Sequence, residues 1–204
     1  MKAVLLMSGG IDSPVAGYMM KRLGYELICV HLSQEPLTDD AAEIKSVLLS
    51  RKIGASKFYT FTYGQVLAEV ARETKDRYFF IIQKRLMLRV AERAAVLEGA
   101  QGIITGDSLG QVGSQTLSNM ANITKVTSMK ILRPLLSFNK QEIIKVARAI
   151  DTYETSKGPE ICNLLGPKHP ATKSWEDMVL HEESKLDMER IVNSIMESKR
   201  ETVL

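Results

Sequence analysis

Cysteine is scarce in this chain of 204 residues, which contains only Cys29 and Cys162 beside three histidines. Two cysteines make neither a disulfide framework nor a four-cysteine zinc or iron–sulfur site, and three histidines are too few for a dense metal cluster. Long apolar runs are also missing, since no stretch approaches the roughly 18 residues of a membrane-spanning helix. The apolar run at the start is too short for a secretion signal. We therefore expect a cytoplasmic protein that does not contact a membrane.

The remaining composition is that of an ordinary globular chain. Hydrophobic residues make up 45% and charged residues 25%, which excludes the disordered and fibrous classes. At about 150 residues per domain, the length predicts one domain, or one domain with a short appendage. The net charge of +3 permits an anionic partner such as a nucleic acid but does not require one.

Short apolar runs that are typical of strands alternate with longer helical segments. The expected strands cover residues 2–7, 25–32, 58–61, 102–105 and 131–132. The expected helices cover residues 14–23, 40–52, 66–72, 79–98, 114–122 and 139–150. This alternation predicts an α/β fold in which helices lie on both faces of a parallel sheet.

The last fifty residues depart from this alternation. Residues 151–174 contain three breakers of the Gly-Pro or His-Pro type and predict a long irregular stretch, which in compact domains is often functional. Residues from 175 to about 199 predict one polar, amphipathic helix, whose apolar stripe suits the core or an oligomer contact: Leu186, Ile191, Val192 and Ile195. We expect residues 1–174 to form one domain and residues 175–204 to be its helical extension.

The most informative motif, directly after the first expected strand, is Ser8-Gly9-Gly10-Ile11-Asp12-Ser13. Its glycines let the backbone approach an anion, and the following helix offers free N–H groups and the positive end of its dipole. Ser8 and Ser13 add hydroxyl donors, whereas Asp12 suits an anion site only if a cation such as Mg²⁺ bridges it to phosphate. The alternative is a tight turn in which these side chains are caps.

This motif resembles the loop of the pyrophosphatase-loop (PP-loop) ATPases of the adenine nucleotide α-hydrolase-like fold, which cleave ATP between the α and β phosphates. Its continuation through residue 16 resembles the catalytic domain of the tRNA 4-thiouridine synthases, the ThiI family. Three further stretches match that family in order and spacing, namely residues 84–89, 105–117 and 132–170. The resemblance therefore covers most of residues 1–173.

The resemblance implies a site for ATP and Mg²⁺. It implies that ATP is bound by Leu6, Met7, Ser8, Gly9, Gly10, Asp12, Ser13, His31, Leu32, Lys84, Gly106 and Gln115. It also implies catalytic roles for Asp12, Lys140 and Cys162. Independently of the resemblance, a lysine directly after the expected helix cap Asn139 is unfavourable for the helix dipole, which indicates a function elsewhere. A loop cysteine near Lys168 and His169 has the surroundings that favour a thiolate.

Several of these residues also have ordinary structural interpretations. His31 alone would be read as a satisfied histidine at a strand end, and Cys29 as a core residue. Arg85, Arg89 and Arg93 share one face of a helix, which fits either a solvated surface or a contact with RNA or phosphate. The sequence leaves these two alternatives open.

The function that the resemblance implies is ATP-dependent tRNA sulfur transfer. O4 of the uridine at position 8 of tRNA attacks the α-phosphate, and sulfur carried as a persulfide on Cys162 then replaces the adenylated oxygen to give 4-thiouridine. The resemblance also implies a link to thiazole synthesis for thiamine. Two alternative functions are compatible with the same loop. One is a PP-loop ATPase that adenylates another acceptor, and the other is a non-catalytic module that binds ATP or AMP and acts with a partner.

The resemblance also predicts partners for this function. Family members usually carry a THUMP-containing region that grips tRNA, and some carry a rhodanese domain with a sulfur-carrying cysteine. Neither pattern is found in the 204 residues. We therefore expect tRNA as substrate, a separate sulfur donor of the cysteine desulfurase or rhodanese type, a THUMP-type RNA-binding partner and a homodimer as partners. The family also tends to have Glu where Asp107 stands.

Overall fold

The computed structural model of the protein describes residues 1–158 and 165–204, in which one sheet has the strand order β5-β4-β1-β2-β3-β6. The strands are β1 (Lys2–Leu6), β2 (Glu26–Ser33), β3 (Lys57–Thr62), β4 (Gly102–Ile104), β5 (Lys130–Leu132) and β6 (Arg200–Thr202). The first five pair in parallel, and β6 pairs antiparallel with β3. The predicted parallel sheet is confirmed, whereas the pattern of the sequence does not predict β6.

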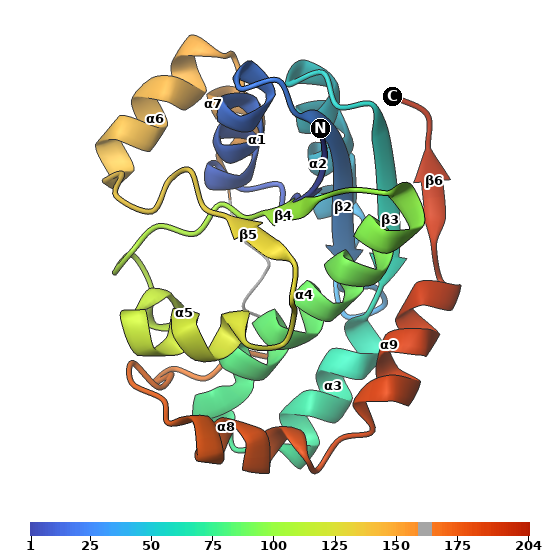
Figure 1. Ribbon diagram of the computed structural model, residues 1–204, viewed down its shortest axis with the longest axis vertical. Coiled ribbons are helices and arrows are strands. Elements are labelled where there is room, and N and C mark those ends of the chain that lie inside the picture. Colours follow the sequence, from blue (N-terminus) through green and yellow to red (C-terminus); the bar gives the residue numbers. More distant parts are fainter. Residues whose placement is uncertain (159–164) are drawn as a thin grey trace.

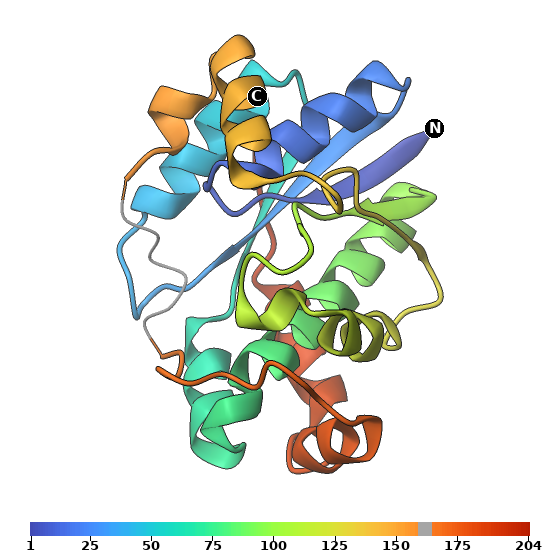
Figure 2. The same cartoon turned by 90° about the vertical axis from the view of Figure 1, so that its left-hand side faces the viewer.

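Helices cover both faces of the sheet (Figure 1, Figure 2). One face carries α1 (Asp12–Arg22), α2 (Ala41–Lys52), α6 (Lys140–Ala149) and α7 (Tyr153–Ser156). The other carries α3 (Gly64–Glu73), η1 (Asp76–Tyr78), α4 (Phe79–Glu98), α5 (Leu117–Thr124), α8 (Glu176–Glu183) and α9 (Met188–Glu197). Within β1, Val4 belongs to one core, while Ala3 and Leu5 belong to the other. This burial on both faces explains why the strands read as continuous apolar runs.

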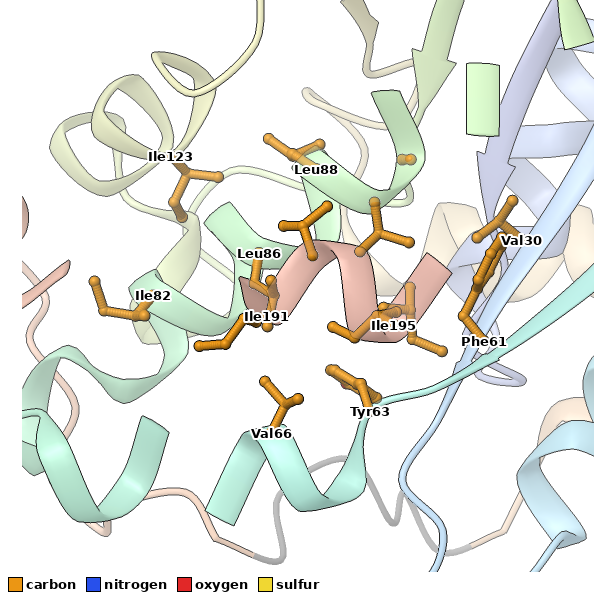
Figure 3. Close-up of a cluster of buried hydrophobic side chains, with 14 of the residues drawn as sticks. Val30, Phe61, Tyr63, Val66, Ile82, Leu86, Leu88, Ile123, Ile191 and Ile195 are labelled. Atoms are coloured by element: carbon orange, nitrogen blue, oxygen red, sulfur yellow. The ribbon is translucent and has the colours of Figure 1, made fainter. Parts of the chain in front are cut away.

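The larger core is built around α4 (Figure 3). Ile82 and Leu86 of α4 lie near Ile191 and Ile195 of α9, and Val66 of α3 faces them from across the cluster. The apolar stripe near the end of the chain is therefore core, which confirms one of its two expected interpretations.

Three predicted boundaries are wrong. The single helix expected from residue 175 is two helices followed by β6, because the Asp187 side chain accepts a hydrogen bond from the Arg190 N–H at 3.0 Å and caps a new helix. The helix expected over residues 114–122 is η2 (Gly113–Gln115) followed by α5, which Thr116 caps. The stretch expected to be irregular, residues 151–174, contains α7. None of the helices described has the length and apolarity needed to cross a bilayer.

A buried ion-pair cluster fixes α8 against α4. Glu183 accepts two hydrogen bonds from Arg85, at 3.0 and 2.6 Å, and two from Arg89, at 2.6 and 3.0 Å. Arg85 is only 4% exposed, whereas Arg93 is exposed. Arg85 is thus a buried ion-pair partner rather than part of a solvated surface, and Arg89, whose side chain is 24% exposed, shares the same carboxylate.

Glu183→Gln is expected to reduce the free energy of unfolding by about 2–3 kcal/mol, because the substitution leaves Arg85 buried without a counter-charge. Burial alone would raise the pKa of Glu183, but hydrogen bonds from Arg85 and Arg89 lower it below its ordinary value. The stabilisation is therefore complete above the ordinary pKa of a glutamate and is lost as the pH falls through the lowered one. Urea unfolding at pH 7 and in acid measures the free energy of unfolding of the variant and of the wild type. The difference between these two free energies should be smaller in acid than at pH 7. Glu197→Gln, on the exposed side of α9, is the control. A difference that is absent at pH 7, or that persists unchanged in acid, would contradict this account.

Candidate functional site

A cavity of about 530 Å³ lies at the carboxyl ends of β1 and β4, where open α/β sheets bind ligands. Its walls come from the segments after these two strands, from α4 and from the start of α6. A smaller hollow of about 60 Å³ opens beside it at the end of β2. Of the predicted site residues, these two spaces are lined by Leu6, Met7, Ser8, Asp12, Ser13, His31, Leu32, Lys84, Gly106, Gln115 and Lys140.

The segment from Ser8 to Ser13 forms a compact loop before α1. The Ser8 N–H donates to the Ser13 hydroxyl at 3.2 Å, and the Gly10 N–H donates to the Ser8 hydroxyl at 3.3 Å. Gly9 has a φ of +78°, and a Cβ there would lie 3.2 Å from the carbonyl oxygen of Ala42, so glycine is needed at this position. No side chain caps α1, which begins at Asp12. The serine hydroxyls accept from backbone N–H groups of the loop, as the tight-turn alternative expects, whereas Ile11 before α1 makes no side-chain hydrogen bond that caps the helix.

Lys140 reaches from the first turn of α6 to the phosphate loop. Its Nζ lies 2.9 Å from Oδ1 of Asp12. The preceding Asn139 caps α6 in a capping box with Glu142, as the sequence predicts for the cap. A lysine that is unfavourable for the dipole of its own helix thus lies against a carboxylate 128 positions away, at the edge of the cavity.

Asp107, directly after Gly106, is the centre of a polar cluster on the opposite wall. It accepts from Lys84 Nζ at 2.6 Å, from the Thr105 hydroxyl at 2.8 Å, from Arg133 Nε at 3.3 Å and from Gln115 Nε2 at 3.5 Å. Burial alone would raise the pKa of Asp107, but its cationic neighbours and the Thr105 hydroxyl hold that pKa far below the ordinary range. The carboxylate is therefore ionised at neutral pH.

No role for Arg133 follows from the sequence pattern. In the sequence, Arg133 is marked only by its place in the stretch 132–170, which matches the family. The structure places its guanidinium against Asp107, close to Lys84 and Gln115, which were both predicted for the site.

His31 is 4% exposed and lies at the end of β2 beside the smaller hollow. Its Nδ1 is 2.9 Å from the carbonyl oxygen of Met7 and 3.1 Å from the Ser46 hydroxyl, whereas its Nε2 has no partner among the described residues. Because a carbonyl only accepts, Nδ1 carries the proton and Nε2 is left as an acceptor. Burial lowers the pKa of His31, which keeps the ring neutral. The interpretation as a satisfied histidine is therefore only half right.

The two cysteines lie in different situations. Cys29 is fully buried in β2, and burial raises the pKa of its thiol to about 12, so it is the core residue that the sequence predicts. Cys162 lies outside the described residues, as does Glu160 in the matching motif. Gly9 and Gly10 are part of the phosphate loop but do not line either space.

Comparison with protein families matches residues 1–188 to the family described as thiamine biosynthesis protein (ThiI). A probable tRNA sulfurtransferase of Alkaliphilus oremlandii is 36% identical over 203 residues, covering 97% of this chain and 52% of that protein. A probable tRNA sulfurtransferase of Staphylococcus aureus is 38% identical over the same length, covering 97% of this chain and 50% of the relative. The chain thus spans about half the length of the curated relatives it matches.

Solved structures show the same likeness. A 4-thiouridine synthetase in complex with RNA and bound ATP superposes with a TM-score of 0.94 at 35% identity, covering all of this chain and 55% of the other. The NMN synthetase of Francisella tularensis superposes at 0.61 with 16% identity, covering 96% of this chain and 84% of the other. The second likeness concerns the fold alone, and together with the first it confirms the predicted adenine nucleotide α-hydrolase-like fold.

Proposed function

Since this chain belongs to the ThiI family, we propose that it is an ATP-dependent tRNA sulfurtransferase that converts the uridine at position 8 of tRNA into 4-thiouridine. The observation that carries the proposal is the arrangement around one cavity: an uncapped phosphate loop faces Lys84 and Asp107, and Lys140 lies at its edge. The similar 4-thiouridine synthetase, crystallised with ATP and RNA, supports both the nucleotide and the substrate class.

ATP is proposed to bind across both spaces. The adenosine part suits the smaller hollow, which Leu6, Met7, His31 and Leu32 line. The phosphates suit the loop from Ser8 to Ser13, because α1 directs its positive end there and Ser8 and Ser13 line the cavity with hydroxyl groups. Gly106 brings the other wall close, since a Cβ at this position would lie 3.0 Å from the Ser13 nitrogen.

Mg²⁺ fits this arrangement through Asp12. Magnesium binds through one or two carboxylates together with substrate phosphates and water. Asp12 offers one carboxylate at the cavity, and the described residues contain no group of three or more acidic, histidine or cysteine ligands. The ion would therefore be held jointly by Asp12 and the phosphates, whose charge it would neutralise.

The reaction is proposed to have two steps. O4 of the uracil attacks the α-phosphorus, the bond to the β-phosphate breaks, pyrophosphate leaves and N3 loses its proton. Lys140 stabilises the charge that develops on the phosphates. The terminal sulfur of a persulfide on Cys162 then attacks C4, AMP leaves with the former O4, and the base is joined to Cys162 through a disulfide bond. A thiol, from the sulfur donor or an added thiol reductant, attacks the sulfur of Cys162, so that the S–S bond breaks, 4-thiouridine leaves with its electron pair, and the thiol and Cys162 form a new disulfide. The persulfide sulfur must be supplied by a donor of the desulfurase or rhodanese type.

Other parts of the proposal rest on the family alone. They are a THUMP-type RNA-binding partner, a homodimer, a cytoplasmic location and a contribution to thiamine biosynthesis. We also propose that residues 175–204 belong to the same domain as residues 1–174, an assignment supported by the ion pairs of Glu183 with α4.

The proposal is tested with ATP labelled at the α-phosphate, unmodified tRNA and no sulfur source. We expect pyrophosphate release and transfer of label to the RNA, both dependent on tRNA and both lost with a tRNA that has cytidine at position 8. The assay is repeated with an added THUMP protein. Label transfer to a different acceptor would favour another PP-loop ATPase. ATP binding without pyrophosphate release under any of these conditions would favour the non-catalytic module.

A further inference from the structure

Arg133 lies behind the wall of the cavity. It follows β5, and its side chain is 14% exposed but does not line the cavity, whereas Asp107 and Lys84 both do. Its Nε donates to Oδ2 of Asp107 at 3.3 Å, and its Nη2 donates to the Thr124 hydroxyl at 2.9 Å, in the last turn of α5. Arg133 therefore ties three segments together and contacts the carboxylate from outside the lining of the cavity.

The charges of this cluster do not balance. One carboxylate, Asp107, faces two permanent or near-permanent cations, Lys84 and Arg133. One positive charge is left over, and Lys84 is the cation of the two that reaches the cavity. Without Arg133, Lys84 and Asp107 would form a neutral pair with little attraction for a polyanion.

Lys84 is held by Asp107 at 2.6 Å, and a phosphate bound in the cavity would compete with Asp107 for its ammonium group. A buried carboxylate that loses its counter-charge is strongly unfavourable, so this exchange requires a second partner for Asp107. Arg133 and the Thr105 hydroxyl provide it, because both stay in contact with Oδ2 while Lys84 contacts Oδ1.

We propose that Arg133 is a positioning residue for the nucleotide: it keeps Asp107 paired from behind and so releases Lys84 to the phosphates of ATP. This inference rests on the proposed function, since it assumes that ATP occupies the cavity. Arg133 itself does not touch the nucleotide.

The test is the affinity for α,β-methylene ATP, which is not cleaved between the α and β phosphates, measured by titration calorimetry on the full chain. Arg133→Gln is expected to weaken binding about tenfold, the loss typical of one charge-assisted interaction. Arg93→Gln removes the same charge from an exposed site on α4 and is the control, expected to stay within about twofold of wild type. Arg133→Lys, which keeps the charge but not the fork to Thr124, should recover part of the affinity.

A second substitution separates positioning from a merely structural role. Asp107→Asn combined with Arg133→Gln restores the surplus positive charge on Lys84, because the carboxylate and its rear partner are removed together. We expect the double variant to bind the analogue within about threefold of wild type, since the two effects act through one network. A structural role for Arg133 predicts instead that the double variant is at least as weak as Arg133→Gln.

The outcomes are distinguishable. Arg133→Gln with unchanged affinity, or a double variant without recovery, overturns the inference. Wild-type protein that does not bind the analogue overturns the proposed function instead. If Arg133→Gln does not fold, Thr124→Val serves in its place, because it removes the rear anchor of Arg133 and leaves every charge present. That variant should bind the analogue about threefold more weakly than wild type, and unchanged binding counts against the inference.

Discussion

Lys140→Met is expected to lower the rate of tRNA-dependent pyrophosphate release by about 100- to 1,000-fold, the loss typical of removing one preorganised charge from a transition state. The Nζ of Lys140 is fixed 2.9 Å from Asp12, at the cavity edge where the proposed α-phosphate would gain negative charge. Single-turnover release from preformed enzyme–ATP complex measures the chemical step. Asp12→Ala should lose the same step, because it removes both the partner of Lys140 and the proposed ligand of Mg²⁺.

Lys145→Met is the matched control, because Lys145 is an exposed lysine on the same helix, α6. It should release pyrophosphate within about twofold of wild type, as surface substitutions usually do. Normal release by Lys140→Met would remove Lys140 from the mechanism, and normal release by Asp12→Ala would do the same for Asp12. A parallel loss in Lys145→Met would indicate damage to α6 rather than to the site.

Cys162→Ser is expected to abolish 4-thiouridine formation, by at least about 1,000-fold, while leaving pyrophosphate release within about threefold of wild type. A hydroxyl in place of the thiol cannot carry a persulfide, but the adenylation step does not use it. The α-label should therefore stay on the tRNA instead of leaving as AMP. Thiolation is measured by the absorbance of 4-thiouridine in the product and adenylation by the label.

Cys29 provides the matched control for this prediction. It is the other cysteine of the chain, and burial raises the pKa of its thiol to about 12, so it is protonated at neutral pH. Cys29→Ala should keep thiolation, at a cost of about 1 kcal/mol in stability for the lost volume. Thiolation that survives in Cys162→Ser would make Cys162 structural, and loss of both steps would mean that the substitution disturbs the ATP site.

The fold could be predicted from the sequence wherever an element carries its own signal. α4 begins and ends where its pattern says, because a long apolar periodicity runs into Gly99, whose φ of +63° ends the helix. β6 could not be predicted, since its three residues are polar and become a strand only by pairing with β3. The sequence pattern did not predict that a second helix begins after Asp187. A polar residue that caps a helix cannot be distinguished by pattern from the other polar residues of an amphipathic helix.

The candidate site likewise has features that local motifs predict and features that depend on tertiary packing. Local motifs predicted a tight loop directly before a helix, and the unfavourable dipole position of Lys140 predicted that its side chain acts away from its own helix, which its contact with Asp12 agrees with. That its partner is Asp12, across 128 positions, follows only from the packing of α6 against α1. The same holds for Arg85 and Arg89, whose spacing is identical to that of exposed Arg93 but which are occupied by Glu183. Spacing on one helix does not reveal which of its charges another helix will cover.

β6 has a consequence for the behaviour of the protein in concentrated solution. β3 reads Lys-Phe-Tyr-Thr-Phe-Thr, a hexapeptide rich in β-forming residues, without proline and with one charge. Such a segment at an open sheet edge is a template on which a second molecule can add a strand. Arg200–Thr202 pair with this edge, and Thr202 lies opposite Phe58 (Figure 1). The backbone groups of β3 are therefore not open to pairing with a strand of a second molecule. β6 thus covers a sheet edge that is separate from the cavity at the ends of β1 and β4.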